Sequence, residues 1–179
     1  MTPVTQQWLP AIQQAGFIDQ IQQSHHLYNL HQVDQNFWKF VDGQWLELFG
    51  YDAAKQAGCF DDVCYNLAIP IPNQNATNQI DLAATYAASL LIAECKAEGE
   101  PFKTAHLDKL SAIANMIGGS FVVKLFITAR SRRKTDPRHM NSFLDQAKAR
   151  QIVVVTGEQL PDLATILKQE TQQPTYARV

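Results

Sequence analysis

Two apolar segments of strand length, 79–85 and 89–96, follow each other so closely that the sequence predicts a β-hairpin. If the hairpin is symmetric, Asp81 on the first strand stands opposite Glu94 on the second, because both are equally far from its turn. Lys96 lies two residues beyond Glu94 and therefore shares its face of the sheet. A largely apolar hairpin thus has to accommodate two carboxylates and one ammonium group on one side.

Like charges that face each other across a hairpin destabilise it, so this group of side chains needs a compensating partner. A divalent cation between the carboxylates is one solution, with the lysine orienting or deprotonating a water molecule that attacks phosphorus. An ion pair of Lys96 with one carboxylate at a sheet edge is the other, and spacing alone does not choose between them. The register also requires a turn centred between Ala87 and Ala88, which lack the Asn-Gly sequence of a tight hairpin. A longer loop that shifts the register by one residue would turn these side chains to the other face.

The rest of the sequence predicts a mixed α/β fold. Residues 43–56 have the apolar spacing of a helix that Asp42 caps and Gly58 ends, and the alternating segment 63–71 is a strand. After the hairpin, the predicted elements are a helix at 105–117, a strand at 120–128, a helix at 139–150, a strand at 152–155 and a helix at 158–170. The order is helix, three strands, helix, strand, and then helix, strand and helix, without an internal repeat.

The two ends of the chain differ from this central part. Residues 1–40 are rich in glutamine and have apolar residues at loosely helical spacing, so they predict a helical N-terminal extension. The folded domain is predicted to extend over 41–170, with a mobile C-terminal tail at 171–179.

Composition excludes several classes of protein. The 179 residues are 46% hydrophobic and 18% charged, which suits one folded domain. No apolar run approaches the ~20 residues of a membrane-spanning helix, and the amino terminus lacks the pattern of a secretory signal. The three cysteines have no CxxC spacing and predict neither a disulfide framework nor a zinc site. We therefore expect a protein of a bacterial-type cytoplasm with no membrane partner.

Positive charge is concentrated in one part of the chain. Residues 101–150 contain 10 Lys and Arg against 3 Asp and Glu, whereas residues 1–100 contain 3 against 11. This imbalance favours a polyanionic partner, and a solvated basic face is the alternative. The densest part is the loop ARSRRKTDPRH at 129–139, where guanidinium groups suit phosphate and aromatic residues that could stack on bases are scarce. The candidate contacts to a nucleic-acid backbone are Arg130, Arg132, Arg133, Lys134 and Arg138.

Four further polar residues are candidates, and two of them have two interpretations each. His106 and Lys109 lie on the polar face of their predicted helix and are candidates for contact with a backbone phosphate. Gln79 shares the face of Asp81 and either contacts phosphate or water or is an ordinary strand glutamine. Lys124 interrupts an apolar strand, so it is either buried with a partner or extends to solvent at a strand edge.

An acidic residue followed a dozen residues later by Glu-x-Lys at the end of a hairpin resembles the PD-(D/E)xK nuclease superfamily. Asp81 and the sequence Glu94-Cys95-Lys96 are the matching residues here, and the helix, three strands, helix, strand order over 43–128 is that of its core. The segments GQWLE, NQIDL, LIAECK, LDKLSAIANMIGG and AKARQIVVV, spread in order over 41–167, resemble the nuclease domain of CRISPR ancillary nucleases activated by cyclic oligoadenylates.

This resemblance implies a restriction-endonuclease-like fold and hydrolysis of phosphodiester bonds with Mg²⁺ or Mn²⁺. Asp81, Glu94 and the Cys95 backbone carbonyl are the implied metal ligands, joined by Glu47 from the first helix, and Lys96 orients the attacking water. An ordinary exposed helix glutamate is the alternative for Glu47, while the Cys95 thiol is expected to be a small core group.

The implied substrate is DNA, with RNA as a second option, and a role in CRISPR-associated or antiviral defence is the leading expectation. Relatives often act as dimers and carry an additional sensor domain, the CARF domain, which binds the cyclic nucleotide. The forty residues before Asp42 are too few for such a domain, so its activator is not carried over. We expect a free-standing nuclease domain or a fragment, with a homodimer or an activator protein in trans as partners. A DNA repair or restriction nuclease and a non-catalytic nucleic-acid-binding module are the alternatives.

Overall fold

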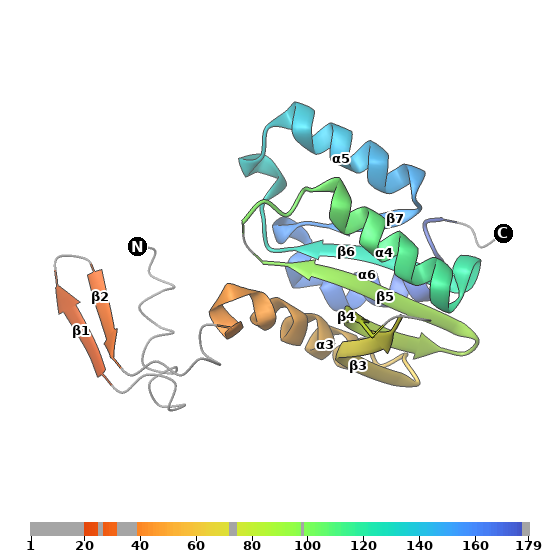
Figure 1. Cartoon of the computed structure of the whole chain (residues 1–179), viewed down its shortest axis with the longest axis horizontal. Helices are drawn as coiled ribbons and strands as arrows, with labels where there is room; N and C mark the ends of the chain where they lie inside the picture. The colour runs from red at the N-terminus through yellow and green to blue at the C-terminus, as the bar shows by residue number, and fades with distance from the viewer. Residues whose placement is uncertain (1–19, 25–26, 32–38, 72–74, 98, 177–179) are drawn as a thin grey trace. The chain divides into compact units, whose positions relative to one another are not determined.

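A computed structural model describes residues 20–24, 27–31, 39–71, 75–97 and 99–176 (Figure 1). The chain divides into two compact units, residues 1–42 and 43–179. In the first unit, strands β1 (Gln20–Ser24) and β2 (Leu27–His31) form an antiparallel pair. The predicted helical extension over 1–40 is therefore wrong for this part, and residues 1–19 lie outside the described ones. A short polar segment such as QIQQS is compatible with the two-residue period of a strand and with the period of a helix. Pairing with a neighbouring strand therefore decides its conformation.

The first helix of the second unit begins later than its sequence predicts. Residues Phe40–Gln44 form a turn of π-helix in which Gly43 has φ 147°, a conformation that favours glycine and that interrupts regular α-helix. Helix α3 (Trp45–Ala57) starts after this turn, so Gln44 and not Asp42 occupies the N-cap position. Gly58 ends the helix with φ 64°, as predicted, and its N–H donates to the Lys55 carbonyl.

A five-stranded mixed sheet forms the centre of this unit, with the strand order β3-β4-β5-β6-β7. Strands β3, β4 and β5 are antiparallel to one another, whereas β5, β6 and β7 run parallel. The bounds are Asp62–Pro70 for β3, Thr77–Tyr86 for β4, Ser89–Lys96 for β5, Val122–Thr128 for β6 and Ile152–Val155 for β7.

The register of the β4–β5 hairpin agrees with the prediction. The pair Tyr86–Ser89 closes the ladder, so the hairpin is centred between Ala87 and Ala88. Ala87 takes a left-handed φ of 49° without the usual glycine or asparagine. The Asp61 carboxylate accepts the Ala87 N–H at 2.7 Å, and this contact holds the turn in place.

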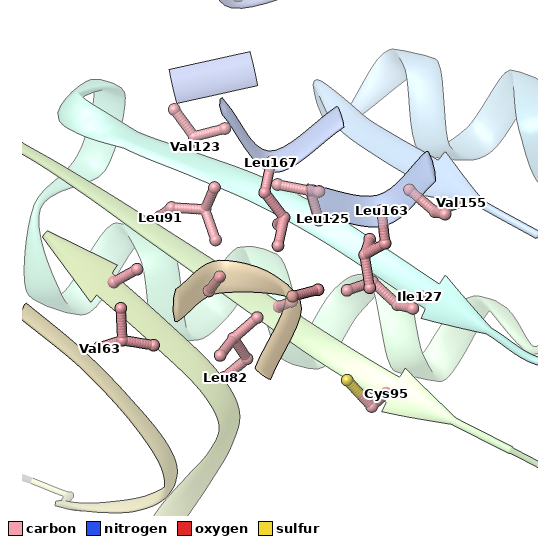
Figure 2. Close-up of a cluster of buried hydrophobic side chains, with 14 of the residues drawn as sticks. Val63, Leu82, Leu91, Cys95, Val123, Leu125, Ile127, Val155, Leu163 and Leu167 are labelled. Atoms are coloured by element: carbon pink, nitrogen blue, oxygen red, sulfur yellow. The ribbon is translucent and has the colours of Figure 1, made fainter. Parts of the chain in front are cut away.

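Helices cover both faces of the sheet (Figure 1). Helices α3 and α6 (Leu163–Gln172) pack on one face around Leu82, Leu91 and Leu125, and Figure 2 shows the α6 side chains against β6. Helices α4 (Thr104–Ile117) and α5 (Pro137–Ala149) pack on the other face around Ile92 and Phe126. Short 3₁₀ turns at Gly119–Phe121, Arg132–Lys134 and Gly157–Asp162 connect these elements. The predicted α/β fold and element order of this unit are confirmed.

The predicted mobile tail is wrong at its beginning. Thr171 is buried in the last turn of α6, and the neighbouring Glu170 carboxylate accepts the N–H of Thr175 at 2.8 Å and its hydroxyl at 2.5 Å. These contacts keep the chain on the core through Tyr176, the last described residue. Among the helices of the described residues, none is long and apolar enough to span a membrane.

Candidate active site

Strands β4 and β5 separate at the position of the two predicted acidic residues. Their ladder ends at the pair Leu82–Ala93, although β4 continues along β3. Beyond this point the Cys95 N–H donates to the Asp81 carboxylate at 2.7 Å instead of to a backbone carbonyl of β4. A side chain thus replaces the next ladder bond, and this replacement fixes the Asp81 carboxylate in the gap between the strands.

Lys96 connects the two buried carboxylates. Asp81 and Glu94 are only 3% and 2% exposed. The Lys96 ammonium lies 2.7 Å from Glu94 Oε1 and 3.6 Å from Asp81 Oδ2, and it donates to the Cys95 carbonyl at 3.1 Å. The three side chains therefore share one side of the sheet. The Cys95 thiol packs in the core cluster of the opposite face, as expected from strand alternation.

Helix α4 brings a second ammonium group to Glu94. The Lys109 Nζ lies 2.7 Å from Glu94 Oε2, and His106 Nδ1 lies 4.0 Å from Glu94 Oε1. The His106 ring also stacks on Phe126, with the ring centroids 6.1 Å apart. Both residues are predicted above to contact phosphate from a polar helix face. The structure places them against the buried glutamate.

Glu47 joins the same cluster from α3, which packs on the other face of the sheet. It lies in the first turn of the helix and is half-buried. Burial raises the pKa of Glu47 to about 7, and the negative charge of Asp81 contributes to the increase. The pKa of Asp81 is raised for the same reasons, with Glu94 as the neighbouring charge. For Lys96, desolvation by burial lowers the pKa, but the attraction and hydrogen bond of Glu94 together with the attraction of Asp81 outweigh it, so the pKa is raised.

The donor groups of this cluster fit a hard divalent cation. Asp81, Glu94 and Glu47 supply the carboxylate oxygens that Mg²⁺ and Mn²⁺ prefer, and the Cys95 carbonyl is next to them. Burial raises the pKa values of Glu47 and Asp81 most, and repulsion between the carboxylates adds to the increase; this repulsion is what such an ion would relieve. In the described part of the chain, however, no three His, Cys, Asp and Glu side chains form a ready metal cluster, and lysine ammonium groups contact the Glu94 oxygens.

Residues 34–173 match the family model of the Card1-like endonuclease domain. The chain belongs to this family. No curated protein matches the sequence. Among solved structures, protein VC1899 from Vibrio cholerae is similar, with a TM-score of 0.71 and 19% identity over 96% of this chain and 43% of that one. Can2 from Sulfobacillus thermosulfidooxidans, solved with cyclic tetra-adenylate, has a TM-score of 0.63 and 18% identity over 93% of this chain and 45% of Can2.

At these identities the two structures establish the fold alone, and the chain spans less than half the length of each. Together with the family match, they confirm the predicted fold class, a PD-(D/E)xK restriction-endonuclease-like core with a central mixed sheet. The family assignment makes the chain an endonuclease domain.

The basic segment 129–139 of this endonuclease domain begins where β6 ends, next to the strand that carries Lys96. All five predicted contact residues are exposed. One turn of 3₁₀ helix spans Arg132–Lys134, and Arg138 lies in the first turn of α5. The Thr128 hydroxyl donates to the Lys96 carbonyl at 2.7 Å and accepts the Arg130 N–H at 3.1 Å. The basic segment is thus tied to the strand end that carries Lys96. A hollow of about 480 Å³ next to it is lined by residues that include Trp45, Arg130 and Lys134.

Glu158 holds the basic segment in place through hydrogen bonds. Sequence patterns did not indicate this role of Glu158. Its carboxylate accepts the Ser131 hydroxyl and the Arg132 N–H, the latter at 3.1 Å. The Ser131 hydrogen bond lowers the pKa of Glu158 to about 2. The neighbouring Gly157 packs closely against Ala129 at the start of this segment. A Cβ atom at position 157 would lie 2.4 Å from the Ala129 carbonyl oxygen. No local spacing links 129–132 to 157–158, so only the tertiary fold reveals this contact.

The two remaining candidates have partners outside this cluster. Gln79 is exposed on β4, where it pairs with Ala68. Lys124 donates to the Arg150 carbonyl at 2.6 Å, and burial lowers its pKa. Lys124 therefore has the partner that a part-buried lysine requires, and this contact is structural.

Proposed function

We propose that this endonuclease domain hydrolyses phosphodiester bonds in DNA, and in RNA as a second substrate, with a divalent metal ion. The observation that supports this most strongly is the position of Lys96 between Asp81 and Glu94 where β4 and β5 separate. Burying these charges costs desolvation energy, and apolar side chains would pack the same space at lower cost. A cluster with perturbed carboxylate pKa values beside a basic surface is better explained by catalysis.

In this proposal Asp81, Glu94, the Cys95 carbonyl and Glu47 hold one Mg²⁺ or Mn²⁺ ion. When bound, the ion stabilises negative charge on the phosphate oxygens and makes water a better nucleophile. Because the pKa of Lys96 is raised, its side chain remains protonated at neutral pH. In the metal-free protein Lys96 therefore donates hydrogen bonds, and in this proposal it orients the attacking water or the phosphate.

The exposed basic residues position the substrate. Arg130 is joined through Thr128 to the strand end that carries Lys96, so a phosphate bound by Arg130 would belong to a nucleotide near the scissile bond. Arginine and lysine contacts to phosphate carry no sequence information. We therefore propose binding through the backbone without recognition of particular bases. The residues in this role are Arg130, Arg132, Arg133, Lys134 and Arg138.

A cleavage assay tests this function. The purified chain is incubated with plasmid DNA, single-stranded DNA and RNA in Mn²⁺, Mg²⁺ or EDTA, beside an Asp81→Asn/Glu94→Gln variant that keeps side-chain size. Parallel reactions contain cyclic tetra-adenylate, because Can2 was solved with it. We expect metal-dependent cleavage that the variant loses while its circular dichroism spectrum is retained. Cleavage that persists in EDTA or in the folded variant would refute the proposed site.

One observation favours a second function, a non-catalytic nucleic-acid-binding module. Two lysines form ion pairs with Glu94, so protein groups compensate the charge of this carboxylate. That function predicts metal-independent binding and no cleavage in any reaction. Within the nuclease proposal, antiviral or CRISPR-associated defence is the leading role, and DNA repair or restriction is the alternative. A homodimer or an activator protein in trans is the proposed assembly.

A further inference from the structure

Each carboxylate oxygen of Glu94 contacts a different lysine. Oε1 lies 2.7 Å from Lys96 of β5, and Oε2 lies 2.7 Å from Lys109 of α4. Glu94 is 2% exposed, so water cannot readily replace either contact. Helix α4 runs alongside β5 and β6 in Figure 1, which explains how a helix residue reaches a strand carboxylate.

The two lysines are held differently. Lys96 also lies near Asp81 and donates to the Cys95 carbonyl, so three oxygen-bearing groups fix its ammonium. Within the described residues, Glu94 is the one group recorded in a hydrogen bond or ion pair with the Lys109 ammonium. The Lys109 side chain is 35% exposed and can therefore move toward solvent. Of the two ammonium groups, Lys109 is the one that can leave without breaking further contacts.

We propose that Lys109 is a built-in counter-ion of Glu94, which a divalent cation must displace from the carboxylate in order to bind. The inference rests on the proposed metal dependence and adds a residue that regulates the metal site. Lys109 would stabilise the metal-free domain and weaken metal affinity at the same time, because an ammonium group and a metal ion compete for one carboxylate oxygen and repel each other. A lysine with a purely structural role would stabilise the metal-free domain but would not weaken its metal affinity.

The test measures metal binding and stability in the full chain, without reference to cleavage. Wild type and Lys109→Met are stripped with EDTA, dialysed and titrated with Mn²⁺ by calorimetry, and melting temperatures are measured with and without Mn²⁺. We expect the variant to bind Mn²⁺ at least about tenfold more tightly, because one repulsive unit charge is gone. Without metal, we expect its melting temperature to fall by roughly 3–6 °C, and Mn²⁺ to recover most of this loss.

Matched variants separate this role from general effects of charge. Lys168→Met removes an exposed lysine of α6, on the other face of the sheet, and is expected to leave Mn²⁺ affinity unchanged. Lys109→Arg keeps the positive charge and should bind Mn²⁺ like wild type. Lys109→Gln keeps a hydrogen-bond donor to Glu94 without the charge, so it tests the same expectation if the methionine variant does not fold.

The outcomes distinguish the two proposals. Wild-type binding of Mn²⁺ with equal or weaker binding by folded Lys109→Met and Lys109→Gln would overturn the counter-ion role and leave the metal site intact. Binding of Mn²⁺ by these two variants but not by wild type would support the counter-ion role of Lys109. Absence of Mn²⁺ binding in all folded proteins would overturn the proposed metal dependence, and the inference with it.

Discussion

Removal of the Glu47 charge should stabilise the metal-free protein. Burial and the charge of Asp81 raise the pKa of Glu47 from 4.5 to about 7, so its ionised form is less favourable in the folded than in the unfolded chain. Between pH 4.5 and about pH 7 the folded chain binds more protons than the unfolded chain does. The free energy of unfolding therefore falls as the pH rises. Above about pH 7 the full free-energy cost of the ionised Glu47 in the folded chain is present, and below about pH 4.5 this cost is absent. Glu47→Gln, which cannot ionise, removes this cost.

The size of the effect follows from the pKa change. A shift from 4.5 to about 7 corresponds to about 3 kcal/mol. Glu47 is only half-buried, however, and solvent screening reduces this figure to about 1 kcal/mol. For a chain of this length, we expect Glu47→Gln to raise the melting temperature by roughly 2–4 °C at about pH 8.

Urea denaturation in EDTA at about pH 5 and about pH 8 measures the effect. The advantage of Glu47→Gln over wild type should be larger at the higher pH, because the unfavourable ionisation of Glu47 in the folded chain is more complete there. Glu100→Gln is the matched control, since Glu100 is exposed and pairs with Lys103 at the surface. An advantage that is absent at the higher pH, or equal at both, would show that the pKa of Glu47 is not raised in the folded chain.

Two further predictions concern the basic segment. Gly157→Ala should lower the free energy of unfolding by about 1–3 kcal/mol in urea titrations, because its Cβ would collide with the Ala129 carbonyl. Gly50→Ala is the control, since its Cβ would make an ordinary 3.5 Å contact in a helix; similar losses in both would contradict the argument. Arg130→Ala/Lys134→Ala should reduce the slope of log K against log salt for DNA by about 0.9 per lost phosphate contact, measured by fluorescence anisotropy. An unchanged slope would mean that these exposed residues do not contact phosphate.

The acidic pair could be predicted because it depends only on local geometry. Side chains alternate along a strand with a period of two, so the hairpin centre alone decides that Asp81 and Glu94 share a face. Strand β1 shows the opposite case. Its residues fit a strand and a loose helix about equally well, and local spacing does not select the partner that settles the conformation.

The contacts of Lys109 and Glu158 could not be predicted, since both join elements far apart in the chain. Leu107 and Leu110 lie on the buried side of α4 at helical spacing, but this spacing does not reveal which strand residue lies within reach of the lysine between them. Likewise, the contact of Glu158 with Ser131 depends on how the segment after β7 packs against that after β6. Residues that complete a site from a second or third element are therefore the ones that sequence patterns miss.

The location of the cluster limits its cost to folding. Two apolar cores, one on each face of the sheet, supply the burial that stabilises the domain, and the charged groups occupy the single gap where β4 and β5 stop pairing. Asp81 compensates there for a ladder bond that the gap removes, because it accepts the Cys95 N–H. An acidic cluster that also replaces a missing backbone partner can be built into a sheet without breaking either core. This arrangement explains why a carboxylate stands at this position of β4, where an apolar residue would leave the Cys95 donor unsatisfied.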